Sequence, residues 1–409
     1  MVAAGTAGRG EQVQAEAEGR ADGDSQCSAG RTMHAAQSTH AVPHGSGISN
    51  RFALRAGRSG ALRLTNGSAR RAAQSELPLA GMPVASSLSV DRELFDHAGY
   101  VVMEDVFDPA TDLDPVVDEY ANLLDEMASR WYAQGLIDST YATLPFAERF
   151  GHVLNDIGPD GYRAFDITLS SPITEDAPIH TGPAVFDLIT RERLLDVVEQ
   201  LVGPEILSNP IQHVRIKPPE LTLNDKFKHK NTMVAATEWH QDQGVATIEV
   251  DATEMLTVWF PVFDTTTENG CLCVVPGSHK RGLLLHCPSK PGQLFDLRIP
   301  EVIRGSEGLP LEMKRGSALF MHRLTMHSSL RNLSPGVRWS FDLRYQPVGQ
   351  PTGRDWLPAF VVRSRADPSR EVRDWRRWAD LWTEARSVIA ANPSVQRPRR
   401  WTGTEAECA

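Results

Sequence analysis

The sequence predicts a mainly β protein, a sandwich or barrel of short strands with flanking α-helices, preceded by a disordered N-terminal extension. Two observations carry this prediction. Residues 211–345 alternate short β-rich segments with turns that contain Gly or Pro, which is typical of sandwiches and barrels. Residues 1–85 are instead rich in Ala, Gly, Ser, Arg and Gln. Such a segment buries too little apolar surface to offset the entropy of ordering it.

The change in composition also predicts how the chain is divided. We expect a disordered extension over residues 1–85, one folded domain over residues 86–395 and a flexible tail over residues 396–409. A domain of this length can bury a sizeable core. Met82 lies just before the change in composition. The alternative is therefore that translation starts at Met82 and that the extension is not made.

Each element of the folded part has a local signal. Helical periodicity predicts helices over Arg92–Ala98, Asp112–Trp131 and Phe186–Val202, and a last amphipathic helix that ends near Ala391. Gly99–Met103 is expected to be a short strand. The other expected strands are Ile211–Lys217, Thr237–Asp242, Leu256–Phe263, Leu272–Val275, Ser317–His322, Met326–Leu330 and Arg338–Tyr345.

Composition argues against two classes of partner. The net charge of -10 disfavours a general nucleic-acid binder, which needs a basic surface. No window approaches 18 uninterrupted apolar residues, so no membrane partner is expected. The five cysteines do not indicate a disulfide framework, which favours a reducing, cytoplasmic location. We expect Cys271 and Cys273 to be small buried core residues, with a metal or redox role as the alternative. No pattern indicates the oligomeric state.

The most specific local feature is the segment Trp239–Gln243. In an extended strand, residues two apart point to the same side, so His240 and Asp242 would present an imidazole and a carboxylate together. They are two of the three ligands of a facial triad, which leaves three metal positions open. The third ligand must come from elsewhere, and the candidates are His322 and His327.

The expected strand Arg338–Tyr345 carries polar residues on one face: Arg338, Ser340, Asp342 and Arg344. Buried charge without a partner is costly, so this face needs one. A dicarboxylate would serve, because Arg338 can bind a carboxylate with two parallel hydrogen bonds. The alternative is an internal Arg–Asp salt bridge along the strand, which stays open for Arg344.

With these motifs in place, the sequence resembles the phytanoyl-CoA dioxygenase family. Four segments carry the resemblance, and their order and spacing fit from about residue 90 to 391: Trp239–Asp242, Thr257–Lys280, Thr325–Asn332 and Leu343–Tyr345. The resemblance implies a double-stranded β-helix, which is a jelly-roll or cupin-like core, flanked by α-helices. It also implies Fe(II) as cofactor, 2-oxoglutarate and O2 as cosubstrates, and a small organic molecule as substrate.

The resemblance further implies roles for individual residues. Fe(II) would be ligated by His240, Asp242 and His327, and His322 would be a bystander. Arg338 would bind the distal carboxylate of 2-oxoglutarate. The other expected contacts to the cosubstrate are Ser329, Trp259, Gln241, Lys217 and Ser340.

The expected reaction is hydroxylation of an unactivated C–H bond, with release of succinate and CO2. A carboxylate at position 242 occupies the metal position that halogenating relatives leave open, so we expect hydroxylation rather than chlorination. Desaturation and ring closure stay open, and no pattern identifies the substrate. One alternative function is a metal-dependent cupin-type enzyme that does not use 2-oxoglutarate, which Arg338 and Ser329 argue against. The other is a non-catalytic small-molecule-binding protein, which the intact ligand set argues against.

Overall fold

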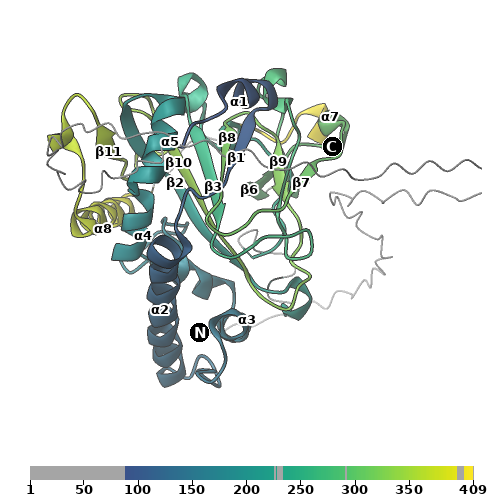
Figure 1. Cartoon of the computed structure of the whole chain (residues 1–409). Coiled ribbons are helices and arrows are strands. Elements are labelled where there is room, and N and C mark those ends of the chain that lie inside the picture. The colour runs from purple at the N-terminus through teal and green to yellow at the C-terminus, as the bar shows by residue number, and fades with distance from the viewer. Residues whose placement is uncertain (1–87, 225–226, 228–233, 291–292, 394–399, 409) are drawn as a thin grey trace, which may run out of the picture. The chain divides into compact units, whose positions relative to one another are not determined.

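The computed structural model describes residues 88–224, 227, 234–290, 293–393 and 400–408 (Figure 1). The predicted N-terminal extension lies outside these residues. A six-stranded antiparallel sheet with the strand order β1-β8-β3-β10-β2-β11 forms the centre of the described part. Its strands are β1 (Tyr100–Met103), β2 (Glu205–Lys217), β3 (Leu256–Pro261), β8 (Ala318–His322), β10 (Arg338–Pro347) and β11 (Phe360–Ser364).

Two smaller antiparallel sheets accompany the large one. One has the order β7-β4-β9, and the other is the hairpin β5-β6. Their strands are β4 (Leu272–Val274), β5 (Cys287–Lys290), β6 (Gln293–Arg298), β7 (Leu309–Leu311) and β9 (His327–Ser329). The expectation of antiparallel sheets with accompanying helices is confirmed.

Eight α-helices lie in the described residues: α1 (Arg92–Ala98), α2 (Asp114–Ala133), α3 (Phe146–Ile157), α4 (Pro183–Ile189), α5 (Glu192–Val202), α6 (Asp242–Val245), α7 (Glu301–Arg304) and α8 (Trp375–Ala391). A π-helical turn covers Pro109–Leu113. Short 3₁₀ turns cover Pro159–Phe165, Glu220–Thr222, Ile248–Ala252, Ser278–Arg281, Pro368–Arg370 and Ala406–Cys408. Figure 1 shows α4, α5 and α8 on one side of the six-stranded sheet. The described helices are all too short or too polar to cross a lipid bilayer.

Strand β10 is buried on both of its faces, and this places the polar residues. Its odd-numbered residues, among them Trp339, Phe341 and Leu343, belong to the main hydrophobic core, which includes residues of the helices. Successive side chains of a strand point to opposite faces. The even-numbered residues Arg338 and Asp342 are therefore directed to the other face, and both are nevertheless buried. Polar groups in that position need partners or a ligand.

One predicted helix differs in the structure. The expected single helix Phe186–Val202 is two helices, α4 and α5, because the chain leaves the helical conformation at Thr190 and Arg191. The Thr190 hydroxyl donates to the Phe186 carbonyl, and Arg191 forms an ion pair with Asp112 at 3.0 Å. The local hydrogen bond and the tertiary ion pair together favour the break over a continuous helix.

The cysteines also differ from expectation, and one residue of the C-terminal tail contacts the folded part. Cys271 and Cys273 are buried, as expected, but Cys287 and Cys408 form a disulfide although 121 residues separate them in the sequence. In the expected flexible tail, Arg400 contacts the folded part: its side chain is 6% exposed and forms an ion pair with Asp251 at 2.6 Å. The expectation of a chain without disulfides was wrong because the pairing joins segments whose proximity depends on the tertiary fold.

Candidate metal and cosubstrate site

The expected strand over Thr237–Asp242 does not form, and a different local structure brings the ligands together. His240 makes an isolated antiparallel bridge with His327, with both backbone N–H···O distances at 3.0 Å. After one extended residue, Asp242 begins α6. The two ligands of this segment are therefore held by a bridge to β9 and by a helical turn. This interpretation of the sequence was wrong because both features depend on tertiary pairing.

One potential ligand atom from each of His240, Asp242 and His327 lies within 4.8 Å of the others, and all three residues are buried. The Nε2 atoms of His240 and His327 are 3.7 and 3.9 Å from Oδ1 of Asp242. His322 lies outside this group. Its ring is close to the ring of His279, with the centroids 5.2 Å apart.

The protonation of both histidines suits a metal. Nδ1 of His240 is 2.8 Å from the carbonyl oxygen of Glu238, and Nδ1 of His327 is 3.0 Å from that of Thr325. A carbonyl oxygen only accepts, so each Nδ1 carries a proton, and Nε2 is the atom that can ligate a metal. Burial, with the neighbouring His327, lowers the pKa of His240 to about 3, so its imidazole is neutral at pH 7.

The carboxylate of Asp242 is held at both oxygens. Arg344 donates to Oδ1 at 2.6 Å, and the hydroxyl of Thr257 donates to Oδ2. Thr257 and Arg344 are cross-strand partners on β3 and β10. Burial disfavours the ionised carboxylate, but Arg344 and the two histidines hold the pKa of Asp242 below its ordinary value. Arg344 also lies 3.2 Å from Asp342, so the expected internal salt bridge is present and extends to the metal ligand.

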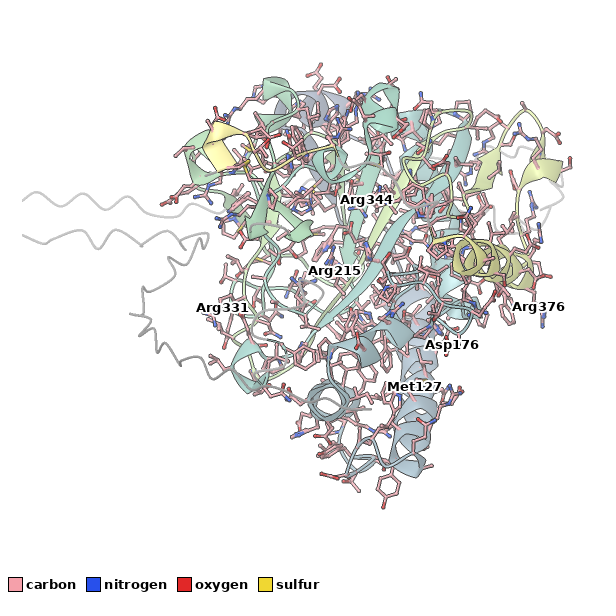
Figure 2. The ribbon with its side chains drawn as sticks, turned by 180° about the vertical axis from the view of Figure 1, so that it is seen from behind. Met127, Asp176, Arg215, Arg331, Arg344 and Arg376 are labelled. Carbon is pink, nitrogen blue, oxygen red and sulfur yellow. A yellow bond between two sulfur atoms is a disulfide. The ribbon has the colours of Figure 1, made fainter. Side chains whose placement is uncertain are left out.

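A small cavity of about 20 Å³ lies beside the triad. Figure 2 shows Arg215 and Arg344 in the middle of the described fold, next to the strands of the large sheet. Besides His240 and His327, the lining includes Arg215, Thr237, Trp259, Met321, Arg338 and Asp342.

Arg338 presents hydrogen-bond donors that suit an anionic ligand. Its Nη1 donates to the hydroxyl of Ser340. Its Nε and Nη2 are buried and have no hydrogen-bond partner among the described residues. These two atoms form the side edge of the guanidinium, which can bind one carboxylate bidentately. Burial, with Arg215 nearby, lowers the pKa of Arg338 to about 9, so it stays charged at pH 7. The edge fits the distal carboxylate of 2-oxoglutarate.

Trp259, Lys217 and Ser329 were also expected to contact the cosubstrate. Trp259 lines the cavity, and the guanidinium of Arg338 lies 5.8 Å from its ring centroid. Lys217 is buried and donates to the hydroxyl of Ser329 at 2.7 Å. Burial and two neighbouring arginines lower the pKa of Lys217 well below its ordinary value. A dianionic ligand would relieve this crowding of positive charge.

The structure directs the side chain of Gln241 away from the cavity. Its amide donates to the carbonyl oxygens of Gly282 and Leu324, and its oxygen accepts from the N–H of Leu284. The structure therefore does not place this side chain where it could contact the cosubstrate, as the resemblance implied. The position of Gln241 between His240 and Asp242 in the sequence does not predict the direction of its side chain, because that direction depends on residues distant in the sequence.

Three residues of the site were not identified from the sequence. Arg215 lies two residues before Lys217 in β2, so alternation along the strand could have placed it on the same face. Thr257 gives no comparable signal, because its role depends on the register of β3 against β10. His286 accepts a hydrogen bond from the backbone N–H of Gln241 at 2.9 Å, and no local pattern indicates that contact.

The chain is similar to known proteins over part of its length. It is 32% identical to phytanoyl-CoA dioxygenase 1 of Oryza sativa subsp. japonica over 32% of this chain and 44% of the relative. It is 30% identical to 1-deoxypentalenic acid 11-beta-hydroxylase of Streptomyces arenae over 28% of this chain and 44% of the relative. The chain thus spans less than half the length of these two relatives.

Among solved structures, the chain aligns with the apo form of the non-heme monooxygenase ThoJ. The TM-score is 0.44 and the identity 18%, over 75% of this chain and 99% of that one. A likeness of this size supports no inference about function. The sequence profile of phytanoyl-CoA dioxygenase (PhyH) matches residues 95–340, which is more than half of the chain. The chain therefore belongs to the phytanoyl-CoA dioxygenase family.

Proposed function

We propose that this protein is an Fe(II)- and 2-oxoglutarate-dependent dioxygenase that hydroxylates an unactivated C–H bond of a small organic molecule. The observation that carries the proposal is one cavity lined by His240, His327 and Arg338. The Nε and Nη2 atoms of Arg338 are buried and have no hydrogen-bond partner among the described residues. When bound, Fe(II) with 2-oxoglutarate and O2 would supply the oxidising chemistry, and succinate and CO2 would be released.

The residues of the chain have separate tasks in this proposal. His240, Asp242 and His327 would hold Fe(II), with a neutral imidazole at His240 and an ionised carboxylate at Asp242. Arg338 would orient 2-oxoglutarate through its distal carboxylate, with Ser340 fixing the guanidinium from the other side. Lys217 and Ser329 would form the adjoining wall of that subsite, and Trp259 its apolar side.

Hydroxylation is the reaction that the ligand set favours. His240, Asp242 and His327 would fill three of six metal positions, which leaves three for 2-oxoglutarate and O2. The carboxylate of Asp242 would fill the position that chlorination needs open. The hydroxylase from Streptomyces arenae, with which this chain shares part of its sequence, is named for such a reaction. We also propose that the two larger sheets form the double-stranded β-helix implied by the resemblance, within a domain over residues 86–395.

A direct test is the fate of 2-oxoglutarate. Purified protein, loaded anaerobically with Fe(II), should take up O2 and form succinate when 2-oxoglutarate is added, even without substrate, at a slow rate. The same protein without 2-oxoglutarate should not take up O2. Uptake that is independent of 2-oxoglutarate would favour the cupin-type alternative, and failure to bind Fe(II) would favour a non-catalytic binding protein.

A further inference from the structure

The C-terminal segment Arg400–Cys408 closes on the part of the chain that directly follows the ligand Asp242. The indole Nε1 of Trp401 donates to the carbonyl oxygen of Gly244 at 2.7 Å. Arg400 donates to the carbonyl oxygen of Thr247 at 2.8 Å and to the carboxylate of Asp251 at 2.6 Å. These contacts hold α6 and the turn after it from outside the cavity.

A second contact reaches the peptide between two ligands. Nε2 of His286 accepts from the backbone N–H of Gln241 at 2.9 Å, and its Nδ1 donates to the carbonyl oxygen of Leu284 at 2.9 Å. The imidazole therefore accepts on one side and donates on the other, which requires its neutral form. Gln241 joins His240 to Asp242, so its peptide plane sets the direction in which both ligands leave the backbone.

The same histidine lies against the C-terminal segment. The ring of Trp401 stacks on that of His286, with the centroids 5.6 Å apart and the planes 20° from parallel. A Cβ atom at Gly244 would lie 2.1 Å from the imidazole, so this packing leaves no room for a side chain at position 244. His286 is thus enclosed between the ligand-bearing segment and Trp401.

A covalent bond fastens this arrangement. Cys287, the neighbour of His286, is joined to Cys408 near the C-terminus. The disulfide attaches the far end of the segment to the strand that begins beside His286, and Trp401 attaches the near end to α6. A closed loop of this kind lowers the entropy of the detached state, which favours the docked one.

We propose that residues 400–408 are a strap that positions the iron-ligand pair, with His286 and Trp401 as its positioning residues, and that the Cys287–Cys408 disulfide makes metal affinity depend on redox state. This inference rests on the proposed function. Ligand geometry must be held within a fraction of an ångström, and loss of outer partners of metal ligands typically costs about 10- to 100-fold in affinity. A dithiol would reduce the disulfide to two cysteine thiols and would itself become a disulfide.

The test measures binding of Co(II), a stand-in for Fe(II) with visible absorption bands, to the full-length protein without substrate. Cys408→Ser and Trp401→Ala should each weaken Co(II) binding by about tenfold. Trp401→Phe keeps the ring but not the Nε1 donor, so its affinity should lie between those of Trp401→Ala and the wild type. Trp375→Ala, in α8, is the matched control. Figure 1 shows α8 far from the C-terminal end, and this variant should bind Co(II) as the wild type does.

Thermal unfolding of each variant separates positioning from general stability. A strap that only stabilised the fold would lower the unfolding temperature of Cys408→Ser without changing its Co(II) affinity, and that result would overturn the proposal. If Trp401→Ala fails to fold, treatment of the wild type with a dithiol, removed before the titration, replaces it. Unchanged affinity after reduction would equally overturn the proposal. A wild type that does not bind Co(II) would instead refute the proposed function, and the strap proposal with it.

Discussion

The two ends of the cavity differ in how completely their polar groups are paired. At the metal end, both histidines donate through Nδ1 to backbone carbonyls, and Asp242 accepts from Arg344 and Thr257. At the other end, the Nε/Nη2 edge of Arg338 is buried and has no partner within the described part of the chain. The metal end is thus preorganised for a small cation, and the Arg338 end is incomplete without an anion.

The largest expected effect is at the metal end. His327→Ala should abolish turnover and strongly weaken Fe(II) binding, because it removes one of the three proposed ligands. His322→Ala is the control: it lies outside the ligand group and should bind iron normally and keep most of the activity. Equilibrium dialysis and succinate formation measure the two properties. The opposite ranking of the variants would mean that His322 is the ligand.

Removal of Arg344 should destabilise the metal-free protein. Arg344→Met would leave the buried carboxylates of Asp242 and Asp342 without their shared cation, which should cost about 3–5 kcal/mol in the free energy of unfolding. Urea denaturation measures this loss. Arg376→Met is the control, since Arg376 lies on α8 at the surface (Figure 2) and its side chain is 70% exposed. Equal stability of the two variants would contradict the account of the metal end.

At the Arg338 end the expected effect is on affinity for the cosubstrate. Arg338→Ala should weaken 2-oxoglutarate binding by about ten- to a hundredfold, equivalent to ~1.5–3 kcal/mol, with Fe(II) binding nearly intact. Arg338→Lys keeps a charge but loses the bidentate edge, so its affinity should lie between those of Arg338→Ala and the wild type. Calorimetric titration with 2-oxoglutarate distinguishes the variants, and equal affinities would sink the assignment.

The neutral histidines predict how stability depends on pH. Burial lowers the pKa of His240 to about 3 and that of His286 to about 4, while the unfolded chain has ordinary histidine pKa values near 6.5. Above about pH 6.5 neither state binds these protons. Between about pH 6.5 and 4 only the unfolded state binds them, so stability falls as pH falls, by about 1.4 kcal/mol per pH unit for each histidine. Urea denaturation of the metal-free protein at pH 7, 6 and 5 should show this decline, and a flat profile would contradict it.

The smallest effect is expected from the N-terminal extension. A chain that starts at Met82 should fold and keep its activity, because the preceding residues lack core-forming side chains. Circular dichroism and succinate formation check this expectation. Loss of soluble protein on truncation would show that the extension packs against the folded part.

Local signals in the sequence predicted those features that short stretches of chain determine. Asp91 caps α1, and Gly99 ends it with a positive φ of 81°, so its bounds could be predicted. Alternation predicted the polar face of β10, including Arg338. The strap, the disulfide and the direction of Gln241 could not be predicted, because each depends on contacts between segments that are 40 or more residues apart. The triad was predicted in part. The types of its residues could be read from the sequence, but the helical turn α6 that carries Asp242 could not.

The most direct test of the central claim is the visible absorption of the anaerobic protein with Fe(II) and 2-oxoglutarate. Chelation of 2-oxoglutarate by a ligated Fe(II) gives a metal-to-ligand charge-transfer band, which requires the triad and the cosubstrate subsite together. The wild type should develop this band on addition of 2-oxoglutarate, His327→Ala should not, and Arg338→Ala should require a higher concentration of 2-oxoglutarate. A wild type that binds Fe(II) but develops no band at saturating 2-oxoglutarate would contradict the account.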